Sequence, residues 1–172
     1  YIVRHGETLS NNHNRLQGHL PGKLTDKGRK QSEALARYLK DIHFDAIVSS
    51  DLTRARQAAL EISRFHSCAP EYTAQCRERC YGDFEGSNRT DFFAQERSRD
   101  NYHAIRPKNG ESLSDVFARV SHFFQDLRRR FPGKRVLIVS HGDFVRIAIG
   151  VLLNKTVIET VELAKTTSLH NA

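Results

Sequence analysis

The sequence predicts an α/β fold, a three-layer α/β/α sandwich in which helices flank a mostly parallel central sheet. Short apolar runs that suit buried strands alternate with longer segments whose apolar residues recur at helical spacing. The 172 residues contain no internal repeat, no low-complexity tract and no evident linker. A single domain over residues 1–172 is therefore expected.

Three apolar runs are the expected central strands: residues 1–3, 46–48 and 136–139. The third run has four consecutive apolar residues, which is typical of a parallel strand buried on both faces. The closing residues, 167–172, also resemble a strand that is cut short.

Four segments are the expected helices. Apolar stripes at helical spacing mark the first three. These stripes are Leu35, Tyr38, Leu39 and Ile42; Leu52, Ala55, Ala59 and Ile62; and Val116, Val120, Phe123 and Leu127. The third helix is expected to begin at Ser112, with Asp115 completing a capping box. The fourth, residues 144–153, is apolar on almost every side and is therefore expected to be buried.

The net charge of +7 and the pI near 9.6 fit either a nucleic acid or a small anion as partner. The run of three arginines at 128–130 falls at the end of an expected helix, where cations complement the helix dipole. Basic and aromatic residues do not alternate elsewhere. The small anion is the favoured partner, and no nucleic acid is expected.

The cysteines, Cys68, Cys76 and Cys80, are odd in number and do not form a disulfide framework or a zinc motif. Reduced thiols in a cytoplasmic protein are expected. No apolar run is long enough to cross a bilayer, so no membrane partner is expected. No carboxylate cluster has the spacing of a metal site, and we predict neither a metal nor a cofactor.

Basic and imidazole side chains follow all three expected strands. Arg4 and His5 come after the first, Arg54 lies shortly after the second, and His141 follows the third. In a parallel sheet, ligands bind beyond the carboxyl ends of the strands. We therefore expect these side chains to meet at one edge of the sheet.

Such a cluster suits phosphoryl transfer. Arginine matches phosphate oxygens with a fork of donors, and Arg54 lies in the first turn of a helix, where an anion is favoured. Neighbouring positive charge keeps His5 neutral, as a nucleophile that attacks phosphorus must be. Taken singly, His5 could equally be structural and Arg54 an exposed helix residue.

Phosphoryl transfer also requires an acid that protonates the leaving oxygen. The candidates are Glu78, Asp83 and Glu85 in the expected loop at 76–86, and Asp143 after the third strand. The residues alone leave this choice open.

Six segments together resemble the histidine phosphatase superfamily, which includes the cofactor-dependent phosphoglycerate mutases. They are "RHGET" at 4–8, "RLQGHLPGKLTDKGRKQ" at 15–31, "SSDLTRARQAA" at 49–59, "RERCYGDFEG" at 77–86, "NGESLSDVFARV" at 109–120 and "VSHGDFVRIAIG" at 139–150. They cover most of the chain in the order of the family.

The resemblance implies a role for each matching position. His5 is the implied phosphorylated nucleophile, and Glu78 is the implied proton donor. Asp143 is the runner-up, because Gly142 separates it from His141. The implied phosphate and substrate contacts are Arg4, Asn11, Gln17, Arg54, His141 and Gly142.

The resemblance implies a phosphomonoester hydrolase that acts through phosphohistidine on a small phosphorylated metabolite. Mutases of this family carry a long basic insertion before the "GES" segment, whereas here a short lid at 87–109 fills that place. The alternatives are a cofactor-dependent phosphoglycerate mutase and a phospho-ligand-binding module without catalysis. Because His5 has to be neutral while Glu78 is protonated, activity is expected to be bell-shaped in pH, with its optimum on the acid side of neutral.

Overall fold

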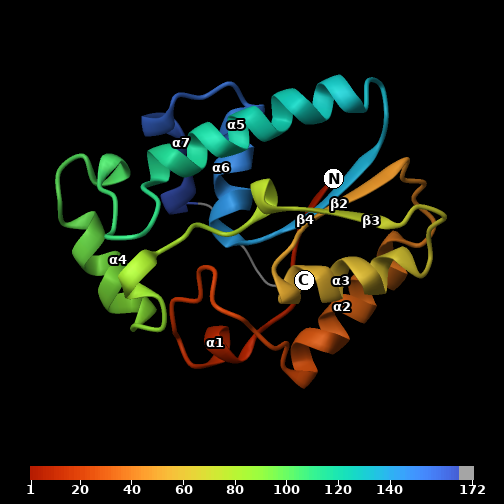
Figure 1. Cartoon of the computed structure of the whole chain (residues 1–172), viewed down its shortest axis with the longest axis horizontal. Coiled ribbons are helices and arrows are strands. Elements are labelled where there is room, and N and C mark those ends of the chain that lie inside the picture. Colours follow the sequence, from red (N-terminus) through yellow and green to blue (C-terminus); the bar gives the residue numbers. More distant parts are fainter. Residues whose placement is uncertain (167–172) are drawn as a thin grey trace.

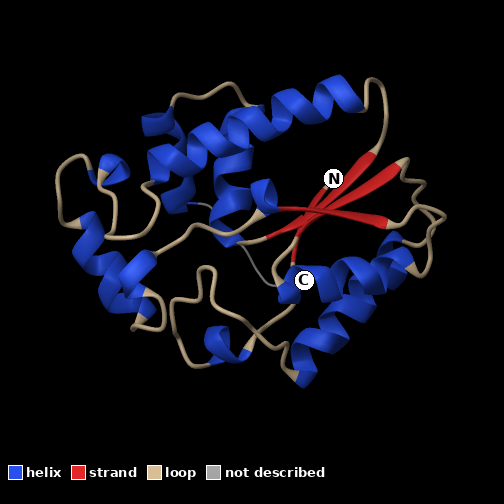
Figure 2. Ribbon diagram, in the orientation of Figure 1, coloured by secondary structure: helices blue, strands red, loops and turns tan. Residues whose placement is uncertain are grey.

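The computed structural model describes residues 1–166, which form four strands and seven α-helices (Figures 1 and 2). The strands are β1 (Ile2–Arg4), β2 (Ala46–Ser50), β3 (Pro70–Thr73) and β4 (Val136–Ser140). The helices are α1 (Leu9–Asn12), α2 (Asp26–Leu39), α3 (Thr53–Ser63), α4 (Arg89–Arg97), α5 (Leu113–Arg130), α6 (Gly142–Leu152) and α7 (Val157–Thr166). The strand expected at 167–172 lies outside the described residues.

The sheet is parallel throughout, in the order β1-β4-β2-β3. Its central strand β4 is buried on both faces, as its apolar sequence predicts. Leu137 and Val139 pack toward α2 and α3, whereas Ile138 packs toward α5 and α6. The alternation places one core on each side of the sheet, so the predicted α/β/α sandwich is confirmed (Figure 1).

The expected helices form, with errors in three of them. α3 begins at Thr53, one residue after Leu52, and the helix expected to be buried over 144–153 ends at Leu152, where Leu152 and Leu153 are exposed. Ser112 caps α5 in a capping box with Asp115, as predicted. In α2, Tyr38 is 79% exposed, and the helix ends at Leu39, before Ile42. The buried face of α2 instead runs through Ser32, Ala36 and Leu39, because small residues allow α2 to lie close to its neighbours.

Strand β3 is the element that the apolar pattern did not predict. It has four residues, begins with Pro70 and is only half-buried at the edge of the sheet. β1 is likewise at an edge of the described sheet rather than at its centre, and β2 and β4 are the central pair.

Gly6 allows the end of β1 to touch helix α2. A Cβ atom on Gly6 would lie 2.1 Å from the backbone oxygen of Gly28, and a Cβ on Gly28 would lie 2.0 Å from the backbone oxygen of Glu7. The space that Gly6 provides is therefore filled by protein backbone. This contact fixes the direction in which the chain leaves His5.

We expect Gly6→Ala to lower the free energy of unfolding by about 1–3 kcal/mol, because the new methyl group forces α2 away from the strand end. Urea unfolding followed by circular dichroism measures this change. An unchanged unfolding midpoint would show that the chain relieves the overlap without cost.

Candidate active site

Three side chains from the carboxyl ends of three strands meet at one edge of the sheet. Arg54, in the first turn of α3, directs its Nε to His5 Nε2 at 3.2 Å and to His141 Nδ1 at 3.1 Å. The two imidazole rings lie 5.0 Å apart, and the His5 backbone N–H donates to Ser140 O. The predicted meeting of His5, Arg54 and His141 is confirmed.

The hydrogen bonds of both imidazoles define which nitrogen carries the lone pair. His5 Nδ1 lies 2.7 Å from Gly6 O, and because a carbonyl oxygen only accepts, Nδ1 is the protonated nitrogen. The lone pair of Nε2 therefore faces Arg54. His141 is arranged in the opposite sense: Nδ1 accepts from Arg54 and Nε2 donates to Ser50 Oγ at 2.8 Å.

Burial keeps both imidazoles neutral. Desolvation, reinforced by the positive charge of Arg54, holds the pKa of His5 and of His141 well below the usual value for histidine. Arg54 is itself only 2% exposed, and burial lowers its pKa to about 10. Its guanidinium is fixed by donation to Gly18 O at 2.7 Å and to Leu20 O at 3.3 Å.

Glu78 is the carboxyl group whose charge acts most strongly on Arg54. Its Oε1 accepts hydrogen bonds from the backbone N–H groups of Arg79 and Asp143, each at 3.0 Å. Burial and then the charge of Asp143 raise the pKa of Glu78, and Arg54 opposes this rise. Glu78 is thus held in a setting that favours its protonated form.

Gly142 leaves open the space between these groups. A Cβ atom there would lie 3.3 Å from Arg146 Nη1, 3.6 Å from Glu78 Oε2 and 3.7 Å from Arg4 Cζ. Arg4 Nε is buried and has no hydrogen-bond partner among the described residues. An anionic ligand would satisfy this donor.

A small pocket, here called the carboxyl-edge pocket, opens over the cluster. Its charged lining consists of Arg4, Arg15, Arg54, Arg89 and Arg146, with Glu78 and Asp143 as the carboxylates. His5, Asn11, Gln17 and Gly142 also line it. The Gln17 Oε1 accepts from Thr8 Oγ1 at 2.9 Å, while its buried Nε2 has no partner among the described residues. The arginine excess and the unpaired donors suit an anion.

The sequence model of the histidine phosphatase superfamily (branch 1) matches residues 1–170. The chain belongs to this superfamily. Its sequence identity to the individual members described below is between 26% and 37%.

Two curated relatives illustrate the range of this superfamily. The fructose-2,6-bisphosphatase TIGAR of Xenopus tropicalis is 37% identical over 134 residues, which are 74% of this chain and 49% of that protein. The probable phosphoglycerate mutase GpmB of Escherichia coli O1:K1 / APEC is 33% identical over 160 residues, 90% of this chain and 72% of that protein. The chain thus spans about half the length of the TIGAR relative.

Two solved structures share the fold of this member of the superfamily. A mycobacterial glucosyl-3-phosphoglycerate phosphatase has a TM-score of 0.84 and 27% identity, covering 99% of this chain and 85% of that one. A putative α-ribazole-5'-P phosphatase from Escherichia coli K-12 has a TM-score of 0.82 and 26% identity, covering 94% and 82%.

The structure brings the predicted site residues of this superfamily member together. His141 is the exception in detail, since it is fully buried behind Arg54 and does not line the pocket. Of the acid candidates, Glu85 accepts from the backbone of His19 and Tyr81, and Asp83 accepts from Asn109, so both are committed elsewhere. Asp143 stays beside Glu78.

Sequence reasoning missed Tyr81, which shapes the acid end of the pocket. Its hydroxyl donates to Asp143 Oδ2 at 2.7 Å, and Arg146 Nη1 lies 3.3 Å from Asp143 Oδ1. Arg146 follows Asp143 by one turn of α6, so its spacing was a usable signal. Nothing in the sequence pairs Tyr81 with Asp143.

The basic residues of the lid divide between two surfaces. Arg89 lines the carboxyl-edge pocket, and Arg97 lies nearby. Arg106 instead pairs with Asp115, and Lys108 with Asp83. Only part of the positive charge of the lid is therefore available to the site.

Within residues 1–166, no three His, Cys, Asp or Glu side chains are grouped so as to hold a metal ion. No helix in this part of the chain is long and apolar enough to span a membrane.

Proposed function

We propose that this histidine phosphatase hydrolyses phosphomonoesters of small metabolites through a phosphorylated His5. The observation that carries the proposal is the lone pair of His5 Nε2, which faces an arginine-lined pocket that also contains Glu78. Arg4 and Arg54 would hold the phosphoryl oxygens, with Asn11, Gln17 and the backbone of Gly142 as further contacts. His141, expected from the sequence to share this role, would act through Arg54, from which its Nδ1 accepts a hydrogen bond.

In the first step, His5 Nε2 forms a bond to phosphorus while the bond to the ester oxygen breaks. Glu78 gives its proton to the departing oxygen. In the second step a water molecule attacks phosphorus, the N–P bond breaks, and the Glu78 carboxylate takes the proton of that water. Inorganic phosphate and the original form of the enzyme result.

The test is release of inorganic phosphate from p-nitrophenyl phosphate and from glycerol 3-phosphate, measured in the presence and absence of EDTA. Release that EDTA leaves unchanged supports the proposed metal-independent hydrolysis. A wild-type protein that binds these esters without turnover would favour the phospho-ligand-binding module instead.

A phosphoglycerate mutase is the second candidate, because the GpmB relative is 33% identical over most of the chain. It requires the phosphoryl group to return to the substrate faster than water removes it. Interconversion of the two monophosphoglycerates, stimulated by the bisphosphate and faster than phosphate release, would establish it. The short lid favours hydrolysis, since it leaves the site open to water.

A second pocket next to the carboxyl-edge pocket is our candidate for the rest of the substrate. It shares Arg89, Asp143 and Arg146 with that pocket and extends along Phe93 and Arg97. The guanidinium groups of Arg89 and Arg97 lie 5.4 and 5.7 Å from the Phe93 ring centre.

The charge balance of this second pocket favours an anion. Arg89 and Arg97 form no ion pair with a described carboxylate, whereas Glu96 is occupied by Arg79 at 2.6 Å. A leaving group with an apolar body and its own acidic group would fit this lining.

We expect Arg97→Ala to lower kcat/KM for 4-carboxyphenyl phosphate about tenfold, a factor that corresponds to about 1.4 kcal/mol. The same variant should leave phenyl phosphate almost unaffected. Arg99→Ala is the matched control, because Arg99 lines a different surface of the lid. An equal effect of Arg97→Ala on both esters would contradict a subsite for an acidic group.

We also propose a domain organisation and a cellular location for the protein. We place one domain over residues 1–172 with the lid at 87–109. The described thiols Cys68, Cys76 and Cys80 are all free, which fits the proposed cytoplasmic location.

A further inference from the structure

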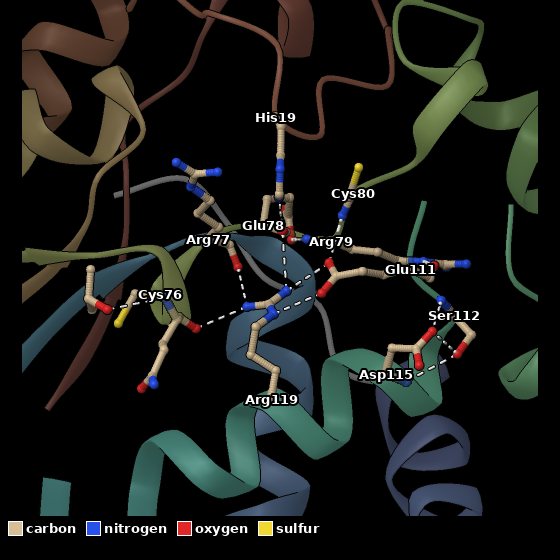
Figure 3. A network of polar contacts seen from close by, with 12 residues as sticks. His19, Cys76, Arg77, Glu78, Arg79, Cys80, Glu111, Ser112, Asp115 and Arg119 are labelled. Carbon is tan, nitrogen blue, oxygen red and sulfur yellow. Dashed lines mark hydrogen bonds and ion pairs between the residues drawn. The ribbon is translucent and has the colours of Figure 1, made fainter. Parts of the chain in front are cut away.

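The backbone that carries Glu78 is held by a side chain from another layer of the protein. Arg119, on α5, reaches across to residues 75–80, here called the acid segment (Figure 3). Its Nη1 donates to Gln75 O at 2.9 Å and to Arg77 O at 3.0 Å, and its Nη2 lies 3.4 Å from Glu78 O.

Glu111 fixes the same guanidinium from the opposite side. Its two carboxylate oxygens accept from Arg119 Nε and Nη2, each at 2.9 Å. Glu111 Oε2 also accepts from the backbone N–H of Cys80 at 2.9 Å, and Glu111 O accepts from Arg79 Nε at 2.8 Å. Arg119 and Glu111 together therefore contact the acid segment before and after Glu78.

The acid segment depends on these contacts, because residues 77–80 belong to no helix or strand. The 3-10 helix η1 (Ala74–Cys76) ends just before them. Apart from Arg119, the Glu78 carbonyl is bonded to His19 Nε2 at 2.9 Å. Hydrogen bonds from side chains therefore hold the backbone around Glu78, whereas hydrogen bonds between strands hold the backbone next to His5.

We propose that Arg119 and Glu111 are positioning residues that set the place of the Glu78 carboxyl group for proton transfer. The proposal rests on the proposed function, in which Glu78 protonates the leaving oxygen. Neither residue lines the carboxyl-edge pocket, and both act through the backbone of the acid segment.

The geometry requires an arginine at position 119. One guanidinium contacts three backbone carbonyls and both oxygens of Glu111, which uses its planar fork of five N–H donors. A lysine ammonium has three donors and no fork. Arg119→Lys therefore keeps the charge while releasing part of the acid segment.

The test compares two esters that differ in their need for an acid. An alkoxide is a poor leaving group and needs the proton, whereas p-nitrophenolate leaves without it. We expect Arg119→Lys and Glu111→Gln to lower kcat/KM for glycerol 3-phosphate by about 10–100-fold, since misplacing a reacting group by about 1 Å costs up to that much. For p-nitrophenyl phosphate we expect kcat/KM to fall no more than about threefold. kcat/KM is the quantity compared because it reports the steps up to departure of the alcohol or phenol, and not the later attack of water, in which Glu78 serves both esters as the base.

Arg129→Lys is the matched control, because Arg129 lies on the same helix, is 80% exposed at its side chain and pairs only locally with Asp126. We expect it to behave as wild type on both esters. Circular dichroism and the activity on p-nitrophenyl phosphate show whether the Arg119 and Glu111 variants are folded.

The double variant Glu78→Gln/Arg119→Lys decides whether the effect passes through Glu78. We expect it to be no slower on glycerol 3-phosphate than Glu78→Gln alone. Equal losses on the two esters, or multiplied losses in the double variant, would overturn the positioning role. A wild-type protein that hydrolyses neither ester refutes the proposed function, and the positioning role with it.

Discussion

Replacing His5 with alanine is expected to abolish formation of a phosphorylated protein and to lower the rate of phosphate release on the order of 10⁴-fold or more. Among the described residues, His5 is the only histidine that lines the carboxyl-edge pocket, whereas His141 is buried behind Arg54. Rapid quenching with radiolabelled substrate measures the phosphorylated protein, and the label should be lost in acid, as a phosphoramidate is.

His122→Ala is the matched control for this experiment. His122 is exposed on α5, so its removal tests a histidine outside the site. A labelled His5→Ala protein, or phosphate release within about tenfold of wild type, would remove His5 from the nucleophile role. Labelling of wild type and His122→Ala alone would support it.

The meeting of His5, Arg54 and His141 could be predicted because it needs only local information. Each follows an apolar run, and the parallel arrangement of such runs brings their carboxyl ends to one edge. The capping box at Ser112 was equally readable, since both partners lie within one helical turn.

Features that depend on contacts between distant segments could not be predicted. Strand β3 is short and half-buried, and it forms because β2 provides a partner. Tyr38 fits the helical stripe of α2, yet the helix turns another face toward the sheet. The link from Arg119 to the acid segment joins residues about 40 positions apart and leaves no pattern in the sequence.

The choice of acid shows how the structure narrows what the residues leave open. The sequence offers Glu78, Asp83 and Glu85 in one expected loop, and Asp143 after the third expected strand. Of these four residues, only Glu78 and Asp143 line the carboxyl-edge pocket. The backbone N–H of Asp143 donates a hydrogen bond to the Glu78 carboxylate. The family resemblance and the raised pKa of the Glu78 carboxyl group both favour Glu78 as the acid.

We therefore expect Glu78→Gln to lower kcat for glycerol 3-phosphate by about 10²–10⁴-fold, the usual contribution of a general acid.

The two pKa shifts predict which group limits activity on each side of the pH optimum. Because the pKa of Glu78 is raised, its active protonated form is lost as pH rises through that raised value. Because the pKa of His5 is lowered, its active neutral form is lost as pH falls through that lowered value. Wild-type kcat/KM should be bell-shaped with an acid-side optimum, and Glu78→Gln should lack the basic limb.

Asp143→Asn separates the two carboxylates. The charge of Asp143 raises the pKa of Glu78, so its removal should move the basic limb to lower pH while leaving the limb in place. The backbone N–H of residue 143 still donates to Glu78, so the position of the acid is kept. If Asp143 were the proton donor, Asp143→Asn would abolish the basic limb and Glu78→Gln would only shift it. The variant that loses the basic limb of its pH profile, Glu78→Gln or Asp143→Asn, therefore identifies the residue that acts as the acid.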